Sequence, residues 1–374
     1  MRLLINTAST LKGGGVQVAK SFLEECRNFP ENEYHVVLGD MLNQLIERGQ
    51  FPGNFSFYPI GYRPATRVFS FKSRDQFFRK LELKVQPDVV FTTSGPSYWR
   101  PNAPHLTGYN LPHYIYRDSP YFERISTYRR LKWDLKGKII RYFFKNDSDA
   151  YVVQTDDVNE RLRRWLSAER VYTVTNTCSA AYSDSVPAEK KLPDKMSDEF
   201  RFLTLSAWYA HKNLDIIPEI AERLPEEIRK KVTFVLTLPE ADFRDHFGRG
   251  YDSSIVNVGP VPPDEGPSLY QECDGLFLPT LLECFSASYA EAMAMERPVV
   301  TSDLGFARSI CKDAALYFKP ADPGAAASKI QTLIEDSELR KKLVTAGKQQ
   351  LKMFDTPKER AEKYLTICEG LIKG

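Results

Sequence analysis

Two glutamates eight positions apart, Glu283 and Glu291, stand in the segment best suited to ligand chemistry. The segment follows an apolar run at 274–279, so Glu283 is expected in the loop after a strand and Glu291 inside the next helix. Backbone N–H groups at the start of that helix, around Ser286, would bind an anion. A carboxylate accepts hydrogen bonds from vicinal hydroxyls, as an acidic residue does for ribose in dinucleotide folds. One short segment could therefore hold a sugar, a phosphate and a ribose.

The elements that position these residues alternate between short apolar runs and helical patterns. The first series has strand-like runs at 2–6, 34–39, 88–93 and 150–155, and a helical pattern at 16–28. The second series has runs at 200–207, 232–238, 255–259, 274–279 and 298–302, and helical patterns at 215–224 and 286–296. This rhythm is typical of a doubly wound parallel sheet, in which ligands bind beyond the carboxyl ends of the strands.

Two such series predict an α/β fold with two Rossmann-like domains that face each other across a cleft. We expect the domains at 1–180 and 200–355, joined by an aperiodic linker at about 178–199 that is rich in Ser, Ala, Pro and Lys. A final helical pattern at about 356–374 could pack back on the first domain. A length of 374 residues agrees with two domains, because one hydrophobic core rarely grows so large.

Composition narrows the class of protein. Apolar residues make up 42% and charged residues 27%, which is ordinary for a globular protein. No apolar run approaches the length of a transmembrane helix, and the beginning of the chain lacks a signal-peptide pattern. We therefore expect a cytoplasmic location. The six cysteines have no zinc-ligand spacing, and in a cytosolic protein we expect them to be free thiols.

The net charge of +2 conceals an asymmetry between the two halves. Residues 1–180 contain 26 Lys and Arg against 18 Asp and Glu, and the remainder contains 25 against 31. A basic first half indicates an anionic partner there, such as a phosphorylated lipid carrier, a membrane surface or a nucleic acid.

The segment around the glutamates resembles a known family. It reads Pro279-Thr-Leu-Leu-Glu283-Cys-Phe-Ser-Ala-Ser-Tyr-Ala-Glu291-Ala-Met-Ala-Met-Glu-Arg-Pro298-Val-Val. Glycosyltransferase family 4, a retaining family with the GT-B fold, has P-S-x-x-E-G-F-G-x-x-x-x-E-A-M-A-x-G-x-P-V-V. The glutamates and Phe285 match in register, whereas Cys284 and Ser286 replace glycines.

The resemblance implies roles for these residues. Glu283 would face the donor sugar, and Glu291 would hold the ribose of the nucleotide. Upstream, Gly259-Pro-Val261 resembles the family's G-x-V, and 269–274 resembles its L-Y-x-x-A-D. The donor site would therefore also include Gly259, Val261, Phe285 and Ser286.

A second part of the resemblance follows the first strand of the second domain. Ser206-Ala-Trp-Tyr-Ala-His-Lys212-Asn213 lies where the family has G-R-x-x-x-x-K-G, whose Arg and Lys neutralise the donor diphosphate. Lys212 matches, but Ala207 occupies the Arg position. A departing diphosphate needs cationic or dipolar stabilisation. Ser206, the helix start after Ser286 and the Gly-rich loop must then share that task with Lys212, unless an arginine from elsewhere supplies the charge. Asn213 lies beside Lys212 in the donor site.

The first domain offers two further candidates. Gly14 and Gly15, between the first strand and the first helix, resemble the family's G-G-[VAI] loop, although a tight turn without a ligand would also use glycines. Family members often place a histidine near the sugar in this domain. His113 is the candidate for that catalytic position and His105 its rival, with a purely structural histidine as the alternative.

Residues 117–145 combine nine Lys and Arg with three Asp and Glu and several aromatic residues. Such a segment suits the surface of an anionic membrane or a single-stranded nucleic acid, or it is simply the solvated face of a helix. We expect no nucleic acid, and consider peripheral attachment to the inner face of the cytoplasmic membrane.

The hypothesis is a retaining, metal-independent glycosyltransferase without a cofactor. Its donor would be a nucleoside-diphosphate sugar of the UDP or GDP type, and its acceptor a saccharide or lipid-diphosphate-linked saccharide. The resemblance suggests bacterial O-antigen or capsule synthesis. The alternatives are a non-catalytic sugar-nucleotide-binding subunit, a GT-B sugar-nucleotide epimerase and a nucleic-acid-binding protein.

Overall fold

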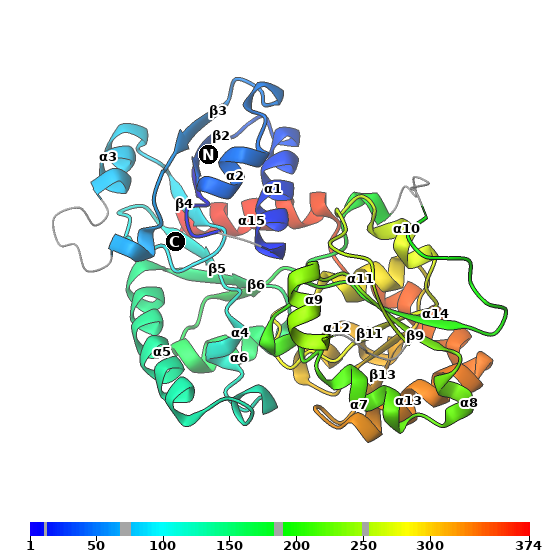
Figure 1. The fold of residues 1–374 in the computed structure, drawn as a ribbon. Coiled ribbons are helices and arrows are strands. Elements are labelled where there is room, and N and C mark those ends of the chain that lie inside the picture. The colour runs from blue at the N-terminus through cyan, green and yellow to red at the C-terminus, as the bar shows by residue number, and fades with distance from the viewer. Residues whose placement is uncertain (11–12, 68–75, 183–189, 249–253) are drawn as a thin grey trace. The chain divides into compact units, whose positions relative to one another are not determined.

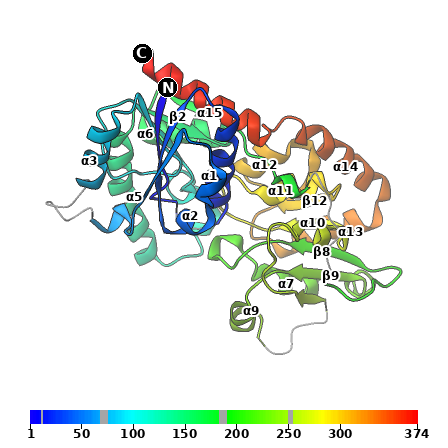
Figure 2. The same ribbon diagram turned by 90° about the horizontal axis from the view of Figure 1, so that it is seen from above.

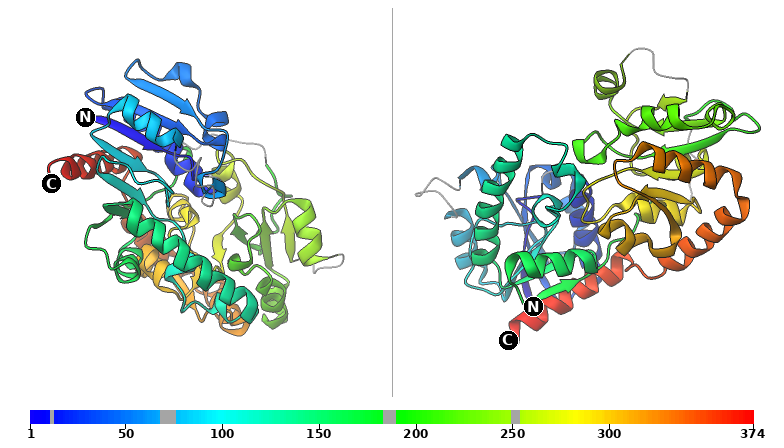
Figure 3. Two further views of the ribbon diagram at one scale, coloured as in Figure 1. Left: turned by 90° about the vertical axis from the view of Figure 1, so that its left-hand side faces the viewer. Right: turned by 90° about the horizontal axis from the view of Figure 1, so that it is seen from below.

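The computed structural model describes residues 1–10, 13–67, 76–182, 190–248 and 254–374. They form two α/β units (Figure 1). The first unit comprises Met1–Arg117, Ser126–Asn176 and Asp355–Gly374, and the second comprises Asp118–Ile125 and Thr177–Phe354. Part of the expected linker, 183–189, lies outside the described residues. Both ends of the chain belong to the first unit (Figure 3).

The first unit is built on a parallel sheet of seven strands in the order β3-β2-β1-β4-β5-β6-β7. The strands are β1 (Arg2–Asn6), β2 (Glu33–Leu38), β3 (Phe55–Pro59), β4 (Val89–Thr92), β5 (His105–Gly108), β6 (Ala150–Val153) and β7 (Val171–Thr173). The helices are α1 (Gly14–Glu25), α2 (Asp40–Leu45), α3 (Gln76–Val85), α4 (Pro112–Ile115), α5 (Thr127–Asp147), α6 (Asp156–Leu166) and α15 (Pro357–Ile372). The order reverses between β1 and β4.

The second unit is a parallel sheet of six strands in the order β10-β9-β8-β11-β12-β13. The strands are β8 (Phe200–Thr204), β9 (Val232–Leu236), β10 (Ile255–Asn257), β11 (Gly275–Leu278), β12 (Val299–Ser302) and β13 (Ala315–Phe318). The helices are α7 (Ile216–Arg223), α8 (Glu226–Arg229), α9 (Glu240–Phe247), α10 (Gly266–Gln271), α11 (Ala287–Ala294), α12 (Gly305–Cys311), α13 (Pro323–Glu335) and α14 (Ser337–Leu351). The order reverses between β8 and β11.

The prediction of two parallel-sheet, Rossmann-like domains is therefore confirmed. The central strands are buried on both faces, as expected for parallel sheets covered by helices. Among the described residues, no helix combines the length and hydropathy needed to cross a bilayer.

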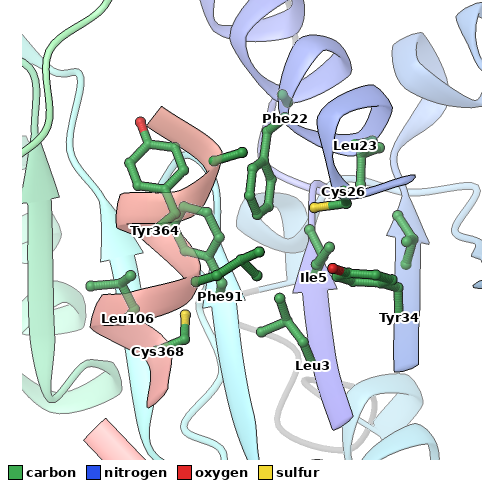
Figure 4. Close-up of a cluster of buried hydrophobic side chains, with 14 of the residues drawn as sticks. Leu3, Ile5, Phe22, Leu23, Cys26, Tyr34, Phe91, Leu106, Tyr364 and Cys368 are labelled. Carbon is green, nitrogen blue, oxygen red and sulfur yellow. The ribbon is translucent and has the colours of Figure 1, made fainter. Parts of the chain in front are cut away.

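The final helix α15 returns to the first unit and completes its core. It lies beside α1 (Figure 2), where Phe22, Phe91 and Tyr364 pack edge to face or tilted, with ring centroids 5.1–5.4 Å apart (Figure 4). Its start is fixed by a capping box between Thr356 and Glu359 with a proline at the first helical position. The buried Arg360 donates hydrogen bonds to Asn176 and Ser21 of the same unit.

Candidate active site

The second unit concentrates its polar groups where the strand order reverses. In open parallel sheets, this switch point leaves a crevice between the loops that follow the two central strands. Here these are the loop after β8, which ends at Lys212 and Asn213, and the loop after β11, which contains Glu283. The N–H of Leu281 donates to the carbonyl of His211 at 2.7 Å, so the two loops are joined by their backbones.

Lys212 and Glu283 form an ion pair between these two loops. Lys212 Nζ lies 2.5 Å from Glu283 Oε1, and both side chains are 13% exposed. The hydroxyl of Thr280 donates to the same carboxylate oxygen at 3.2 Å. Because both groups are largely buried, their mutual attraction is stronger than it would be in water. The structure thus brings together two of the predicted catalytic residues.

The neighbouring His211 does not add a positive charge. Burial, assisted by the charge of Lys212, lowers the pKa of the imidazole to about 3. The ring stacks on Tyr209 at a centroid distance of 5.4 Å. His211 is therefore neutral at physiological pH, and its backbone carbonyl serves to hold the loop after β11.

Glu291 of α11 is half-buried beside two tyrosine hydroxyls. Tyr270 Oη lies 3.5 Å from Glu291 Oε2, and Tyr182 also donates a hydrogen bond to this carboxylate. Burial raises the pKa of Glu291 to about 7, and the two hydroxyls and Lys212 offset only part of that rise. Lys212 is thus within electrostatic reach of both glutamates.

The start of α11 also lies in this region. Ser286 is the N-cap residue, is buried, and makes no side-chain capping hydrogen bond. Cys284 is buried, and Phe285 packs edge to face on Phe354 at a centroid distance of 6.0 Å. The predicted contact of Phe285 with the donor stays a prediction.

Other predicted donor-site residues line the ends of the same sheet. Ser206 donates its N–H to Thr237 Oγ1 at 3.0 Å, and its hydroxyl donates to the carbonyl of Ala207. Gly259 follows β10 with φ +77°, a left-handed conformation that favours glycine, and Val261 is partly exposed close behind it. These loops belong to one edge of the sheet, because they all follow parallel strands.

A segment from the first half of the chain packs on the second unit. Residues 118–125 belong to that unit, where Ser119 Oγ donates to the carbonyl of Leu281 at 2.7 Å. Arg124 donates to Asn213 Oδ1, directly after Lys212. The expected boundary of the first domain at residue 180 did not anticipate this segment. It places an additional guanidinium at the loop whose family arginine is replaced by Ala207.

The glycine loop in the first unit meets polar side chains at the other switch point. Gly13, the N-cap residue of α1, has φ +68°, and a Cβ on Gly15 would lie 3.2 Å from Asn110 Nδ2. The hydroxyls of Thr10 and Thr93 lie 3.1 Å apart across the ends of β1 and β4. Gly14 has open space around it. The described part of the loop therefore lies beside hydroxyl and amide groups, and the contact of Gly14 and Gly15 with a ligand stays a prediction.

The two candidate histidines of the first unit differ. His113 lies in α4, is partly exposed, and stacks on Trp133 of α5 at a centroid distance of 4.4 Å. His105 is fully buried within β5, with its ring nitrogens bonded to Thr92 and to the carbonyl of Asp147. Burial lowers its pKa to about 4. His105 is therefore a structural residue of the sheet and not a rival for a sugar contact.

Among the described residues, no group of three or more His, Cys, Asp or Glu has a metal-binding geometry. An Asp-Ser-Asp triplet occurs at 147–149, but Asp149 pairs with Arg100 at 2.6 Å and accepts the N–H of His105. Of the six cysteines, all are free thiols, as expected.

Comparison with known proteins gives similarity in sequence and in fold. An O-antigen chain mannosyltransferase B of Escherichia coli is 25% identical over 274 residues, which cover 67% of this chain and 70% of that protein. Sucrose-phosphate synthase of Thermosynechococcus elongatus has a similar structure, with a TM-score of 0.76, 14% identity, and 100% and 99% of the two chains covered. HepE of Anabaena in complex with UDP and glucose has a TM-score of 0.68, with 14% identity and 98% and 100% covered.

Two parallel-sheet domains with these neighbours define the fold as GT-B, the architecture of two-domain glycosyltransferases. Residues 186–350 match the model of a family described as glycosyl transferases group 1. Residues 186–350 are therefore similar to group 1 glycosyl transferases, and the predicted resemblance is confirmed. The matched range contains Lys212, Glu283 and Glu291.

Proposed function

We propose that the chain transfers a sugar from a nucleoside-diphosphate sugar to a hydroxyl of a saccharide or lipid-linked saccharide, with retention of configuration and without a metal. The observation that carries this proposal is the Lys212–Glu283 ion pair at the switch point, with Glu291 and the start of α11 on the same side of the sheet. Lys212 would neutralise the diphosphate, Glu283 would meet the sugar, and Glu291 would accept hydrogen bonds from the ribose.

The chemical step requires one bond to break and one to form on the same face of the sugar. The bond between the anomeric carbon and the diphosphate oxygen breaks, and the acceptor oxygen attaches from that side. The acceptor hydroxyl proton passes to the departing phosphate oxygen. This course needs no carboxylate nucleophile, so the engagement of Glu283 with Lys212 is compatible with it. Stabilising the leaving charge is the main task of the protein.

Arg124 is proposed as the second cation of the donor site. It bonds to Asn213, the residue after Lys212, and it comes from a segment anchored to the loop after β11 through Ser119. A guanidinium binds phosphate oxygens through a planar array of donors. It could therefore supply the positive charge that Ala207 cannot.

The acceptor class and the biological setting are supported by the relatives. The similar O-antigen chain mannosyltransferase suggests a role in polysaccharide synthesis, and HepE binds UDP, which favours a nucleotide-sugar donor. In the first unit, the polar loop around Gly15 and Asn110 is the proposed acceptor contact. His113 is retained as a proposed residue near the sugar.

The experiment is calorimetric titration of the protein with UDP, GDP, ADP and CMP, each in the presence of EDTA. Binding of one diphosphate that is abolished by Lys212→Met or Glu291→Ala, but kept in the matched surface variant Glu222→Ala, would support the donor site. No binding by the folded wild type would refute it. Glu283→Gln should remove turnover but not nucleotide binding. Unchanged turnover would favour a non-catalytic subunit, and donor consumption without acceptor would favour an epimerase.

A further inference from the structure

The helix α5 exposes a continuous apolar row, here named the α5 ridge. It consists of Tyr128, Leu131, Leu135, Ile139 and Tyr142, which are 74%, 62%, 64%, 40% and 60% exposed. Each follows the previous one by three or four positions, so all five lie on one helix face. Single exposed apolar residues are ordinary, whereas a contiguous row of this kind marks an interaction surface.

The ridge is not the result of a loosely packed helix. The other side of α5 is well anchored, because Ile140, Phe143 and Phe144 are buried in the first unit. Trp133 stacks on His113. The helix therefore has two apolar faces, one packed in the core and one turned to solvent.

Positive charge surrounds the ridge. The helix contains seven Lys and Arg against two Asp, of which Asp134 is paired with Arg117 at 2.5 Å and Asp147 is buried. Lys132 and Lys138, both exposed, lie about 60° to either side of the ridge at about 100° per residue. Long cationic side chains beside an apolar strip can reach outward while their stems lie along it.

We propose that the α5 ridge docks on the surface of an anionic lipid bilayer. The apolar side chains would enter the boundary between headgroups and acyl chains, and the flanking lysines and arginines would meet the lipid phosphates. The charge complementarity identifies this occupant. The proposal deepens the proposed function, since a membrane-bound helix would bring the first unit to a lipid-linked acceptor, but the binding itself does not require transferase activity.

Two other occupants fit the ridge less well. A second copy of the chain would bring two strongly cationic helices together, which costs electrostatic energy. A single-stranded nucleic acid stacks its bases on aromatic rings. The two tyrosines of the ridge stand at its ends, about 21 Å apart along the helix, with only aliphatic side chains between them.

The test is cosedimentation of the full chain with vesicles of phosphatidylcholine, alone and mixed with phosphatidylglycerol. The wild type should bind only the mixed vesicles. Leu131→Ser with Leu135→Ser should lower the partition coefficient at least tenfold. Lys132→Gln with Lys138→Gln should lower it about tenfold and weaken its dependence on salt. The control is Leu83→Ser on α3, which removes an even more exposed leucine, 75% exposed, from the same unit and should change nothing.

Several results would overturn the proposal. The wild type would not bind anionic vesicles, or the ridge double variant and Leu83→Ser would lose vesicle binding equally. A dimer in sedimentation velocity that depends on the ridge, together with vesicle binding that does not, would also overturn it. Ridge-dependent binding of an oligonucleotide but not of vesicles would do the same. Nucleotide titration without vesicles separates the two proposals, because the ridge variants should bind the donor nucleotide like the wild type and thereby also report correct folding.

Discussion

Replacing Glu291 by glutamine should stabilise the second unit in a pH-dependent way. Burial raises the pKa of this carboxyl from 4.5 to about 7, so the folded protein disfavours the ionised form. Ionisation of Glu291 therefore destabilises the fold. This loss of stability is small below pH 4.5, grows between pH 4.5 and 7, and reaches its full size above about pH 7. Glutamine keeps the shape and an acceptor oxygen for Tyr270 but carries no charge.

The size of the effect follows from the shift in pKa. The rise of the Glu291 pKa from 4.5 to about 7 lowers the free energy of unfolding by about 3 kcal/mol at pH 8, which is an upper limit. At pH 5 the loss is about 1 kcal/mol. For a domain of this size, 1 kcal/mol moves the melting temperature by about 2–4 °C. The transition of the second unit in Glu291→Gln should therefore rise by up to about 10 °C at pH 8 and by about 3 °C at pH 5.

The assay is differential scanning calorimetry at both pH values, with the two units followed as separate transitions if they separate. Glu222→Gln on α7 is the control, because this carboxylate is exposed and its neutralisation should change the melting temperature little. A stabilisation that is absent, or that is equal at pH 5 and pH 8, would refute the burial argument. If Glu291 also holds the ribose, the stabilised variant should lose donor affinity, which would be a stability gained at the cost of function.

Two further predictions concern Arg124 and Tyr364. Arg124→Ala should weaken nucleoside-diphosphate binding about tenfold in calorimetric titration, because a charge-assisted hydrogen bond is lost. The control Arg223→Ala on α7 should leave the affinity unchanged. If Arg124→Ala also leaves the affinity unchanged, Arg124 serves only to anchor residues 118–125. Tyr364→Ala should destabilise the first unit by about 3–5 kcal/mol in thermal unfolding, because its ring fills the core against Phe22 and Phe91. The control Met353→Ala, at an exposed position, should change the stability little. A small loss of stability in Tyr364→Ala would mean that α15 contributes little to that core.

The fold was predictable where strands are continuous apolar runs. The central strands β1, β4, β8 and β11 read in this way because both faces of a parallel sheet are covered. The strand β3 (FSFYP) is short and ends in proline, and β5 (HLTG) is short and polar, so neither stands out in the sequence as a buried strand of a parallel sheet. These two strands form because the neighbouring strands β2 and β4 offer them backbone hydrogen-bond partners. This pairing depends on the tertiary structure and is not visible in the local sequence.

The site was predictable to a similar depth. Lys212 and Glu283 follow strands that lie next to each other at the switch point, and a topological rule therefore suffices to bring them together. Tyr182 and Arg124 reach the same region from the expected linker and from the first half of the chain, where the local sequence shows no motif. His105 was a candidate from the sequence that the structure does not support. In the sequence, a buried histidine inside a strand cannot be told from a histidine near a loop.

The charges at the switch point connect the departure at Ala207 with the placement of residues 118–125. Two carboxylates, Glu283 and Glu291, already share the field of Lys212. A diphosphate would add further negative charge at the same place, and one lysine engaged with Glu283 could not offset it alone. The loop after β8 offers no arginine of its own, but Arg124 contacts it directly at Asn213. The contacts of Ser119 and Arg124 attach the segment to the second unit, and under the proposed function its guanidinium would complete the donor site there.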